Sequence, residues 1–227
     1  MLELAGDENR LDAGQSIGPQ IHALLRARIV RGDLEPGARL SESGIAARFG
    51  VSRQPVREVF IKLADEGLLE IRPQRGSVVP RISREKVENV RFVREAVEAD
   101  VVRLAAILFT NEQKDVLDGM LTEQENATDQ NEFMALDDAF HRFLAEGIGR
   151  SHAWSVVEAQ KVQLDRVRYL SLQRFPTAAL IEQHGAIIRA IQAGNAKEAE
   201  KIMREHLRMV LDDLPKIAER NAEFFVP

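Results

Sequence analysis

The chain of 227 residues has no cysteine, and none of its apolar runs approaches the roughly 20 residues that cross a membrane. Disulfides and thiolate chemistry are therefore excluded. The polar, acidic start of the chain also lacks the basic and apolar regions of a signal peptide. Together these absences predict a soluble, cytoplasmic protein that has no membrane partner.

Basic residues are also fewer than acidic ones, so the chain carries a net charge of -5. Such a balance argues against a nucleic-acid partner, but the charges are unevenly distributed. Residues 16–80 contain ten Lys or Arg and seven acidic residues, whereas residues 81–227 contain 20 and 25. A basic segment joined to an acidic one indicates that only the first meets phosphate.

The segment from Leu40 to Val79 has the order of elements that a winged helix-turn-helix needs. A short helix, a tight turn and a second helix are followed by two short strands, near 68–71 and 77–79. Gly50 can adopt the left-handed conformation that ends a helix, and the Ser52 hydroxyl can cap the next one. A further helix, roughly Pro19 to Arg31, precedes this segment.

The sequence of the helix that begins at Arg53 predicts one buried apolar face and one exposed basic face. Its apolar residues recur at helical spacing and should be buried: Val56, Val59, Phe60 and Leu63. Arg53 and Arg57 share another face, near the helix start, where recognition helices reach base edges. Arginine matches guanine O6 and N7, and Gln54 suits adenine or a phosphate. The alternative is an ordinary solvated face, because most charged helix faces contact only water.

This segment and the residues just before it contain a series of short motifs typical of one protein family: Pro36-Gly37, Leu40-Ser41-Glu42, Ile45-Ala46, Gly50-Val51-Ser52-Arg53, Pro55-Val56-Arg57-Glu58, Leu63, Glu66-Gly67-Leu68 and Arg75-Gly76-Ser77. With them the segment resembles the DNA-binding domain of the GntR family of bacterial transcriptional regulators. The resemblance implies operator contacts by Ser52, Arg53, Gln54 and Arg57, and by Arg75 and Gly76 in the wing. Gln54 stands where threonine is commoner in the family, and Ser43 and Gly44 replace longer polar side chains. These departures bear on the operator sequence rather than on the docking mode.

The whole chain is predicted to be mainly α, in three parts. Residues 1–15 are expected to form a disordered arm, 16–80 the winged helix domain with its small β-hairpin wing, and 81–227 an all-α antiparallel bundle of six to seven helices. The expected bundle helices lie near 83–108, 111–128, 131–148, 151–172, 177–193 and 195–220, with breaks allowed in the first and the last. This part resembles the effector-binding domain of the FadR subgroup of GntR regulators.

Four polar residues of the bundle fall on apolar helix faces. Asp137 and His141 lie along the inner stripe of the helix at 131–148, while His184 and His206 stand among apolar residues of later helices. A buried carboxylate is costly unless it is paired or bound to a metal. One carboxylate and three imidazoles suit zinc, nickel, manganese or iron. For any one of these histidines the alternative is a core residue satisfied by a hydrogen bond. The pattern also resembles the metal site of FadR-type sensor domains.

Arg94 lies four residues before Glu98, a spacing that by itself indicates an ordinary ion pair. The resemblance implies instead that Arg94 faces a ligand pocket and holds an organic acid beside the metal. These features favour a homodimeric repressor that releases a palindromic double-stranded DNA operator when a small organic acid binds. One alternative is a regulator that senses the metal itself. The other is a metal-dependent enzyme fused to a DNA-binding domain, although no catalytic residues are evident.

Overall fold

The computed structural model describes residues 11–12, 14–72, 76–172 and 177–226. The chain divides into two compact units, the first running to Ile82 and the second from Ser83 to Phe225. Within the described ranges, no helix has the length and apolar character to span a membrane. The predicted arm falls largely on residues outside these ranges.

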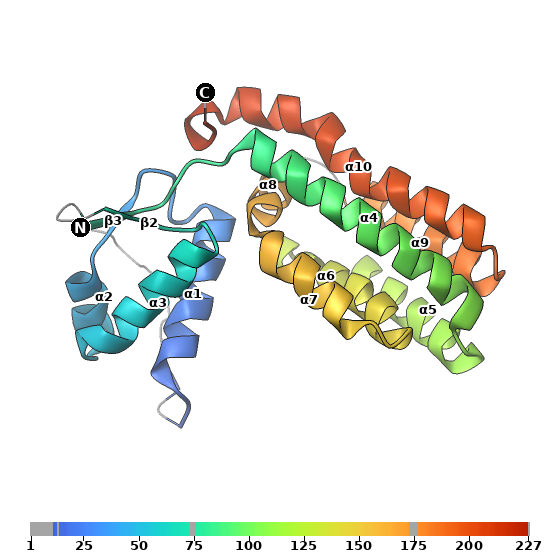
Figure 1. Ribbon diagram of the computed structural model, residues 1–227, viewed down its shortest axis with the longest axis horizontal. Helices are drawn as coiled ribbons and strands as arrows, with labels where there is room; N and C mark the ends of the chain where they lie inside the picture. Colours follow the sequence, from blue (N-terminus) through green and yellow to red (C-terminus); the bar gives the residue numbers. More distant parts are fainter. Residues whose placement is uncertain (1–10, 13, 73–75, 173–176, 227) are drawn as a thin grey trace. The chain divides into compact units, whose positions relative to one another are not determined.

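The first unit combines three helices with a small antiparallel sheet (Figure 1). Its elements are α1 (Ile17–Arg31), β1 (Arg39–Leu40), α2 (Glu42–Phe49), α3 (Arg53–Asp65), β2 (Glu70–Arg72) and β3 (Gly76–Val78). The strand order is β1-β3-β2, so the two wing strands are joined by a third that the sequence did not predict. A strand of two residues is too short to show an alternating pattern. Leu68 and Leu69 were predicted in the wing, but they are buried core residues that precede β2.

The turn between α2 and α3 is set by two residues, one of which acts differently from the prediction. Gly50 ends α2 with a φ of 64°, the left-handed conformation that was expected. Ser52 occupies the N-cap position of α3, but its hydroxyl makes no capping hydrogen bond. The prediction of a hydroxyl cap is therefore wrong. The third helical position is Pro55, which has no N–H to offer to the cap.

The second unit is a bundle of seven helices in the described part of the chain. They are α4 (Arg84–Leu108), α5 (Asn111–Glu125), α6 (Gln130–Gly147), α7 (Ser151–Gln160), α8 (Val162–Leu172), α9 (Ala178–Gln192) and α10 (Ala196–Arg220). The two long helices α4 and α10 lie side by side along the bundle (Figure 1). The predicted fold class, a winged helix-turn-helix followed by a helical bundle, is confirmed.

One helix break is not where the sequence predicted it. α4 and α10 run unbroken for 25 residues each, whereas the expected helix at 151–172 is interrupted at Lys161. Neither glycine nor proline marks this position. The Lys161 side chain is buried, and its ammonium lies 2.6 Å from Asp138 and 2.9 Å from Asp165. The contact with Asp165 has an ordinary i, i+4 spacing, but the contact with Asp138, 23 residues away, is tertiary and has no local sequence signal.

Candidate functional site

The start of α3 presents polar side chains to solvent while the rest of the helix is anchored in the core. Val56, Phe60 and Leu63 are 0% exposed and Val59 is 2% exposed, as predicted. Ser52, Arg53, Gln54 and Arg57 are all exposed. The Gln54 amide donates a hydrogen bond to Glu58 at 3.0 Å. A rigid helix thus carries two accessible guanidiniums at its N-terminal end.

The wing is less completely described than α3. Arg75 lies outside the described residues. Gly76 is exposed, has a φ of 79° and pairs with Arg72 across the hairpin. Arg72, at the end of β2, also carries a positive charge, but its guanidinium lies 3.0 Å from Glu70. Its hydrogen bond and charge lower the pKa of the Glu70 carboxyl, so the pair stays ionised and its charges largely cancel.

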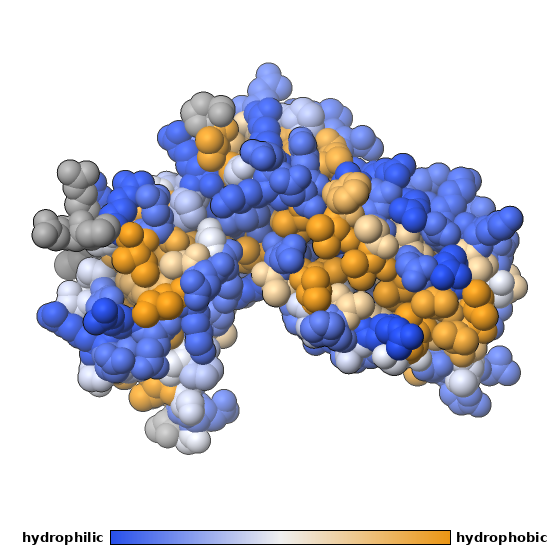
Figure 2. Space-filling model, in the orientation of Figure 1, coloured by the Kyte–Doolittle hydropathy of each residue, from blue (hydrophilic) through white to orange (hydrophobic). Residues whose placement is uncertain are grey.

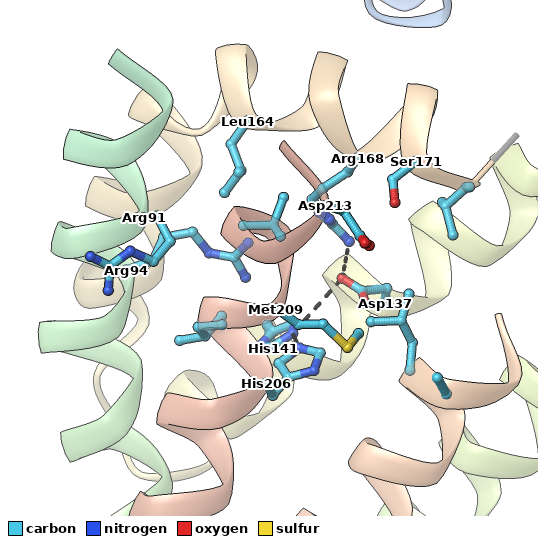
Figure 3. Close-up of a pocket in the computed structure, with 15 residues that line it drawn as sticks. Arg91, Arg94, Asp137, His141, Leu164, Arg168, Ser171, His206, Met209 and Asp213 are labelled. Carbon is cyan, nitrogen blue, oxygen red and sulfur yellow. Dashed lines mark hydrogen bonds and ion pairs between the residues drawn. The ribbon is translucent and has the colours of Figure 1, made fainter. Parts of the chain in front are cut away.

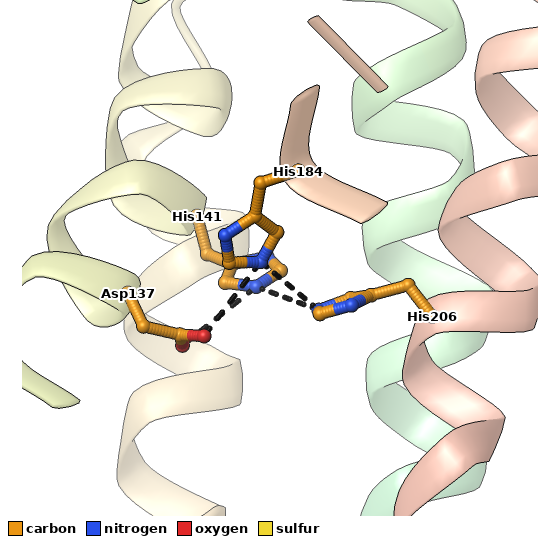
Figure 4. Close-up of side chains that lie close together, drawn as sticks. All are labelled: Asp137, His141, His184 and His206. Atoms are coloured by element: carbon orange, nitrogen blue, oxygen red, sulfur yellow. Dashed lines mark hydrogen bonds and ion pairs between the residues drawn. The ribbon is translucent and has the colours of Figure 1, made fainter. Parts of the chain in front are cut away.

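In the bundle, the four predicted metal ligands converge on one point (Figure 4). Asp137 and His141 stand on successive turns of α6, His184 comes from α9 and His206 from α10. One ligand atom from each of the four lies within 4.8 Å of the other three, and all four residues are buried. The structure therefore brings together residues that lie up to 69 positions apart in the chain.

Each imidazole is oriented by an acceptor at its other ring nitrogen. Gln124 Oε1 lies 2.7 Å from His184 Nδ1, and Gln183 Oε1 lies 2.9 Å from His206 Nδ1. Glu98 Oε2 lies 2.6 Å from His141 Nδ1, a close polar contact whose angle falls short of a well-formed hydrogen bond. The amide groups of Gln124 and Gln183 donate elsewhere, so their oxygens face the rings.

For His184 and His206 this arrangement assigns the ring proton to Nδ1 and leaves the Nε2 lone pair facing the centre of the cluster, toward which His141 Nε2 also points. The sequence did not predict the roles of Gln124 and Gln183, and it treated Glu98 only as a partner of Arg94. Nothing in the sequence around a glutamine indicates that its side chain will accept a hydrogen bond from a histidine of another helix. The partner of His184, for example, lies 60 residues away in the chain.

The distances within the cluster fit a first-row divalent metal. His206 Nε2 lies 3.3 Å from both His184 Nε2 and His141 Nε2. Because a tetrahedron's edge is about 1.6 times its centre-to-corner distance, edges of 3.3 Å correspond to metal–nitrogen bonds of about 2.0 Å, the usual value for zinc. Asp137 lies slightly farther out, with one oxygen 3.7 Å from His184 Nε2. The donor set therefore fits a cation that prefers nitrogen with one oxygen.

The protonation states that burial favours also suit a metal site. Burial lowers the pKa of His184 to about 3, and it lowers the pKa of His206 well below its usual range. Burial opposes ionisation of Asp137, but the Arg168 guanidinium holds its pKa below the usual range. At neutral pH His184 and His206 are accordingly neutral and Asp137 is ionised, which are the ligand forms of these groups.

A cavity of about 240 Å³ adjoins this cluster (Figure 3). Its apolar wall includes Leu164, Leu172, Leu180, Leu207 and Val210, and its polar groups include Arg91, Arg94, Asp137, His141, Arg168, Ser171, His206 and Asp213. An apolar cavity with a few convergent polar groups is typical of a small-molecule site.

Arg94 lines this cavity and also forms the ion pair that its spacing indicated. Its Nε lies 2.6 Å from Glu98 Oε1, and both side chains are buried. The two interpretations of Arg94 are therefore compatible, because Glu98 connects it to His141. Arg168, on α8, was not predicted as a site residue. It faces the cavity and donates a hydrogen bond to Asp137.

Two family models match the chain, one for each unit. The model for bacterial regulatory proteins of the gntR family covers residues 18–79, and the model for the FCD domain covers residues 89–209. The chain belongs to the gntR family of bacterial regulatory proteins, in the branch whose members carry an FCD domain. It is a DNA-binding transcriptional regulator. This family comprises regulators, which supports the expectation that the protein is not an enzyme.

Individual relatives agree with this assignment. The chain is 40% identical to the HTH-type transcriptional repressor RspR of Escherichia coli K12, over 96% of this chain and 97% of that protein. It is 29% identical to a probable D-xylose utilization operon transcriptional repressor of Paenarthrobacter nicotinovorans, over 86% and 88%. Among solved structures, E. coli McbR/YncC shares the fold with a TM-score of 0.73, at 20% identity, over 91% of this chain and 99% of that one.

Proposed function

We propose that the protein is a repressor whose affinity for its operator is set by a small organic acid, bound beside a divalent metal ion in the bundle. The metal would be zinc, nickel, manganese or iron, held by Asp137, His141, His184 and His206. The observation that carries the proposal is the orientation of three buried imidazoles, each presenting Nε2 to one point at the edge of a cavity.

DNA binding is assigned to residues 16–80, and effector binding and dimerisation to 81–227. Arg53 and Arg57 would read base edges in the major groove, with Ser52 and Gln54 beside them. Arg75 and Gly76 of the wing would contact the minor groove or the backbone. The exposure of the α3 residues and the rigid anchoring of that helix support this assignment.

Effector binding would use charge that the chain gathers at the cavity. A bound metal supplies positive charge beside the cavity, and Arg94 adds a guanidinium from α4. Glu98 fixes Arg94 and His141 together, so a ligand that contacts Arg94 also acts on the metal cluster. To change operator affinity, the acid must bind two conformations of the regulator with different affinity.

The names of relatives support an effector linked to carbohydrate use. One relative is the D-xylose utilization repressor described above, and another is the gluconate operon transcriptional repressor of Bacillus subtilis, 29% identical over 88% of this chain. Gluconate is a carboxylate with several hydroxyl groups. Such a molecule would match a cavity that contains both arginines and polar side chains.

A homodimer would present two copies of α3 to the two halves of a palindromic operator. Among the described residues, the three most exposed large apolar side chains all lie on α4: Phe92, Ile107 and Leu108 are 65%, 59% and 57% exposed. Figure 2 shows hydrophobic residues reaching the surface of the bundle on the face turned to the viewer. Sedimentation analysis of Phe92→Glu, with Val116→Glu on α5 as control, tests whether α4 forms the dimer contact. A dimeric Phe92→Glu protein would exclude this surface.

The metal assignment is tested by replacing two ligands at once. The double variant His184→Ala, His206→Ala should lose bound metal while the first unit still binds DNA, because no ligand belongs to that unit. Metal content per chain, measured by mass spectrometry of the purified protein, gives the readout. His152→Ala is the matched control, since His152 is exposed on α7. Equal metal content in wild type and double variant would reject the site.

A second candidate function is metal sensing without an organic ligand, because four protein ligands suffice to complete a tetrahedral site. The two functions differ in what releases the operator. Metal alone would release DNA from a metal sensor, whereas the proposed regulator needs the acid as well. Operator binding followed by fluorescence anisotropy, with each component added in turn, separates them.

A further inference from the structure

Arg168 connects the metal cluster to a second group of charges, in which Lys161 and Asp165 are buried and Asp138 is partly buried. Its guanidinium donates a hydrogen bond to Asp137 and lies 3.2 Å from Asp138 and 3.3 Å from Asp165. Lys161 contacts the same Asp138 and Asp165, at 2.6 Å and 2.9 Å. Arg168 therefore contacts Asp137 and also Asp138 and Asp165, two carboxylates that are already paired with Lys161.

The charges of this group change sign when Asp137 takes up a metal. The three carboxylates and two cations of this group together carry one net negative charge. A divalent ion at Asp137 converts this into one net positive charge. On the cavity wall Arg94 is paired with Glu98 and Arg91 with Glu95, while Asp213 adds a carboxylate. Whatever the starting balance, a divalent ion makes the surroundings of Arg168 more positive by two charges, which strengthens the binding of an anion there.

Arg168 is placed to receive that anion. Its side chain is 13% exposed and forms part of the cavity wall, as does the carboxylate of Asp137 (Figure 3). The same guanidinium can thus contact Asp137 or a carboxylate in the cavity. The planar fork of arginine binds carboxylates in both cases.

We propose that Arg168 is an exchangeable counterion, which holds Asp137 in the absence of metal and holds a carboxylate of the bound acid when the metal takes Asp137. Metal and organic anion then bind with positive coupling, and by linkage each raises the affinity for the other equally. This inference rests on the proposed function, and it adds the residue through which the two ligands are coupled.

The test measures zinc affinity by isothermal titration calorimetry of the full-length protein in two matched solutions. One contains sodium acetate as probe anion, and the other contains acetamide, its neutral counterpart, with sodium chloride at equal ionic strength. Zinc affinities are corrected for the weak binding of acetate to zinc. In the wild type, acetate should raise zinc affinity by about fivefold or more over acetamide, the usual lower range of coupling between sites.

Arg168→Gln should show two opposite effects. Zinc affinity in acetamide should rise by roughly tenfold, because a cation that competes for Asp137 has been removed. The additional effect of acetate should disappear. Arg166→Gln is the matched control, since Arg166 is also a buried arginine of α8 but does not line the cavity. A purely structural role for Arg168 would lower zinc affinity in its variant rather than raise it.

Two outcomes would overturn the inference. Equal zinc affinity in acetate and acetamide for the wild type would show that no anion is coupled to the metal, and this result needs no variant. Retained acetate dependence, or weakened zinc binding, in a folded Arg168→Gln protein would show that Arg168 does not mediate the coupling. Absence of stoichiometric zinc in the wild type would instead reject the proposed metal site itself.

Discussion

The two units of this regulator use arginine in opposite ways. On α3, Arg53 and Arg57 are exposed, and their helix is held by apolar residues. In the bundle, Arg94 and Arg168 are largely withdrawn from water and contact carboxylates of the same or other helices. An exposed guanidinium is free to bind an external phosphate or base, whereas a buried one is bound by its own chain. The difference agrees with the proposal that the first unit contacts DNA from its surface and the second binds a ligand inside.

The comparison predicts the largest stability effect for a buried charge of the bundle. Lys161→Met should lower the free energy of unfolding by about 3–5 kcal/mol, because Asp138 and Asp165 lose their shared ammonium. Urea unfolding followed by circular dichroism measures the change. The control is Arg103→Gln, which removes an exposed pair with Asp100 and should cost about 1 kcal/mol or less. Similar losses for both variants would contradict the distinction between buried and exposed charge.

The exposed arginines should affect DNA binding and leave stability unchanged. Arg53→Ala is expected to weaken operator binding by about 1–3 kcal/mol and to relax base preference. Binding to a selected operator library, read by sequencing, measures both effects. Lys62→Ala, near the other end of α3, is the control and should alter binding less. Unchanged base preference in Arg53→Ala would remove this residue from the reading surface.

Replacing Arg94 should weaken the response to the effector while leaving DNA binding itself nearly unchanged. In Arg94→Gln, the acid's effect on operator binding should weaken by about 1–3 kcal/mol, as for a charge-assisted hydrogen bond, while operator affinity without acid changes little. The first unit, to which DNA binding is assigned, contains no part of the cavity. Operator titrations with and without acid give both quantities. An unaltered acid response would exclude Arg94 from the pocket.

The smallest expected change in stability comes from replacing Glu95, and this change depends on pH. The Glu95 carboxylate accepts hydrogen bonds from Arg208, Arg204 and Arg91, and those from Arg208 lower its pKa most. Because the folded pKa lies below the ordinary value of 4.5, the stabilisation is complete above that pH and is lost as pH falls further.

Glu95→Gln should therefore reduce stability by about 1 kcal/mol at pH 7, an amount typical of partly solvated pairs. The loss should diminish below the ordinary carboxyl pKa. Thermal unfolding of both proteins at a series of pH values provides the measurement. A difference that grows on acidification would have the wrong sign.

The sequence predicted the first unit well because its signals are contiguous. Glycine at the turn and the apolar spacing of α3 act within a few residues, so Gly50, Val56 and Phe60 behave as expected. The exceptions depend on details beyond such patterns. Ser52 does not cap α3, whose third residue, Pro55, offers no N–H, and the two-residue strand β1 is too short for periodicity.

In the bundle, the sequence predicted the helices and the convergence of the four ligands but not the residues that support them. Gln124 and Gln183 orient two imidazoles from other helices, and Arg168 reaches Asp137 across 31 positions of the chain. At the helix break, Lys161 likewise contacts Asp138 from another helix. A polar side chain that acts through a distant partner has no periodic signature, so only the folded arrangement identifies it.

X-ray absorption spectroscopy of the zinc-loaded protein tests the central claim most directly. If the three imidazoles share one ion, the spectrum should show three histidine ligands at about 2.0–2.1 Å together with one or more oxygen ligands. A spectrum with fewer than three histidines, or a protein that binds no stoichiometric zinc, would contradict the account.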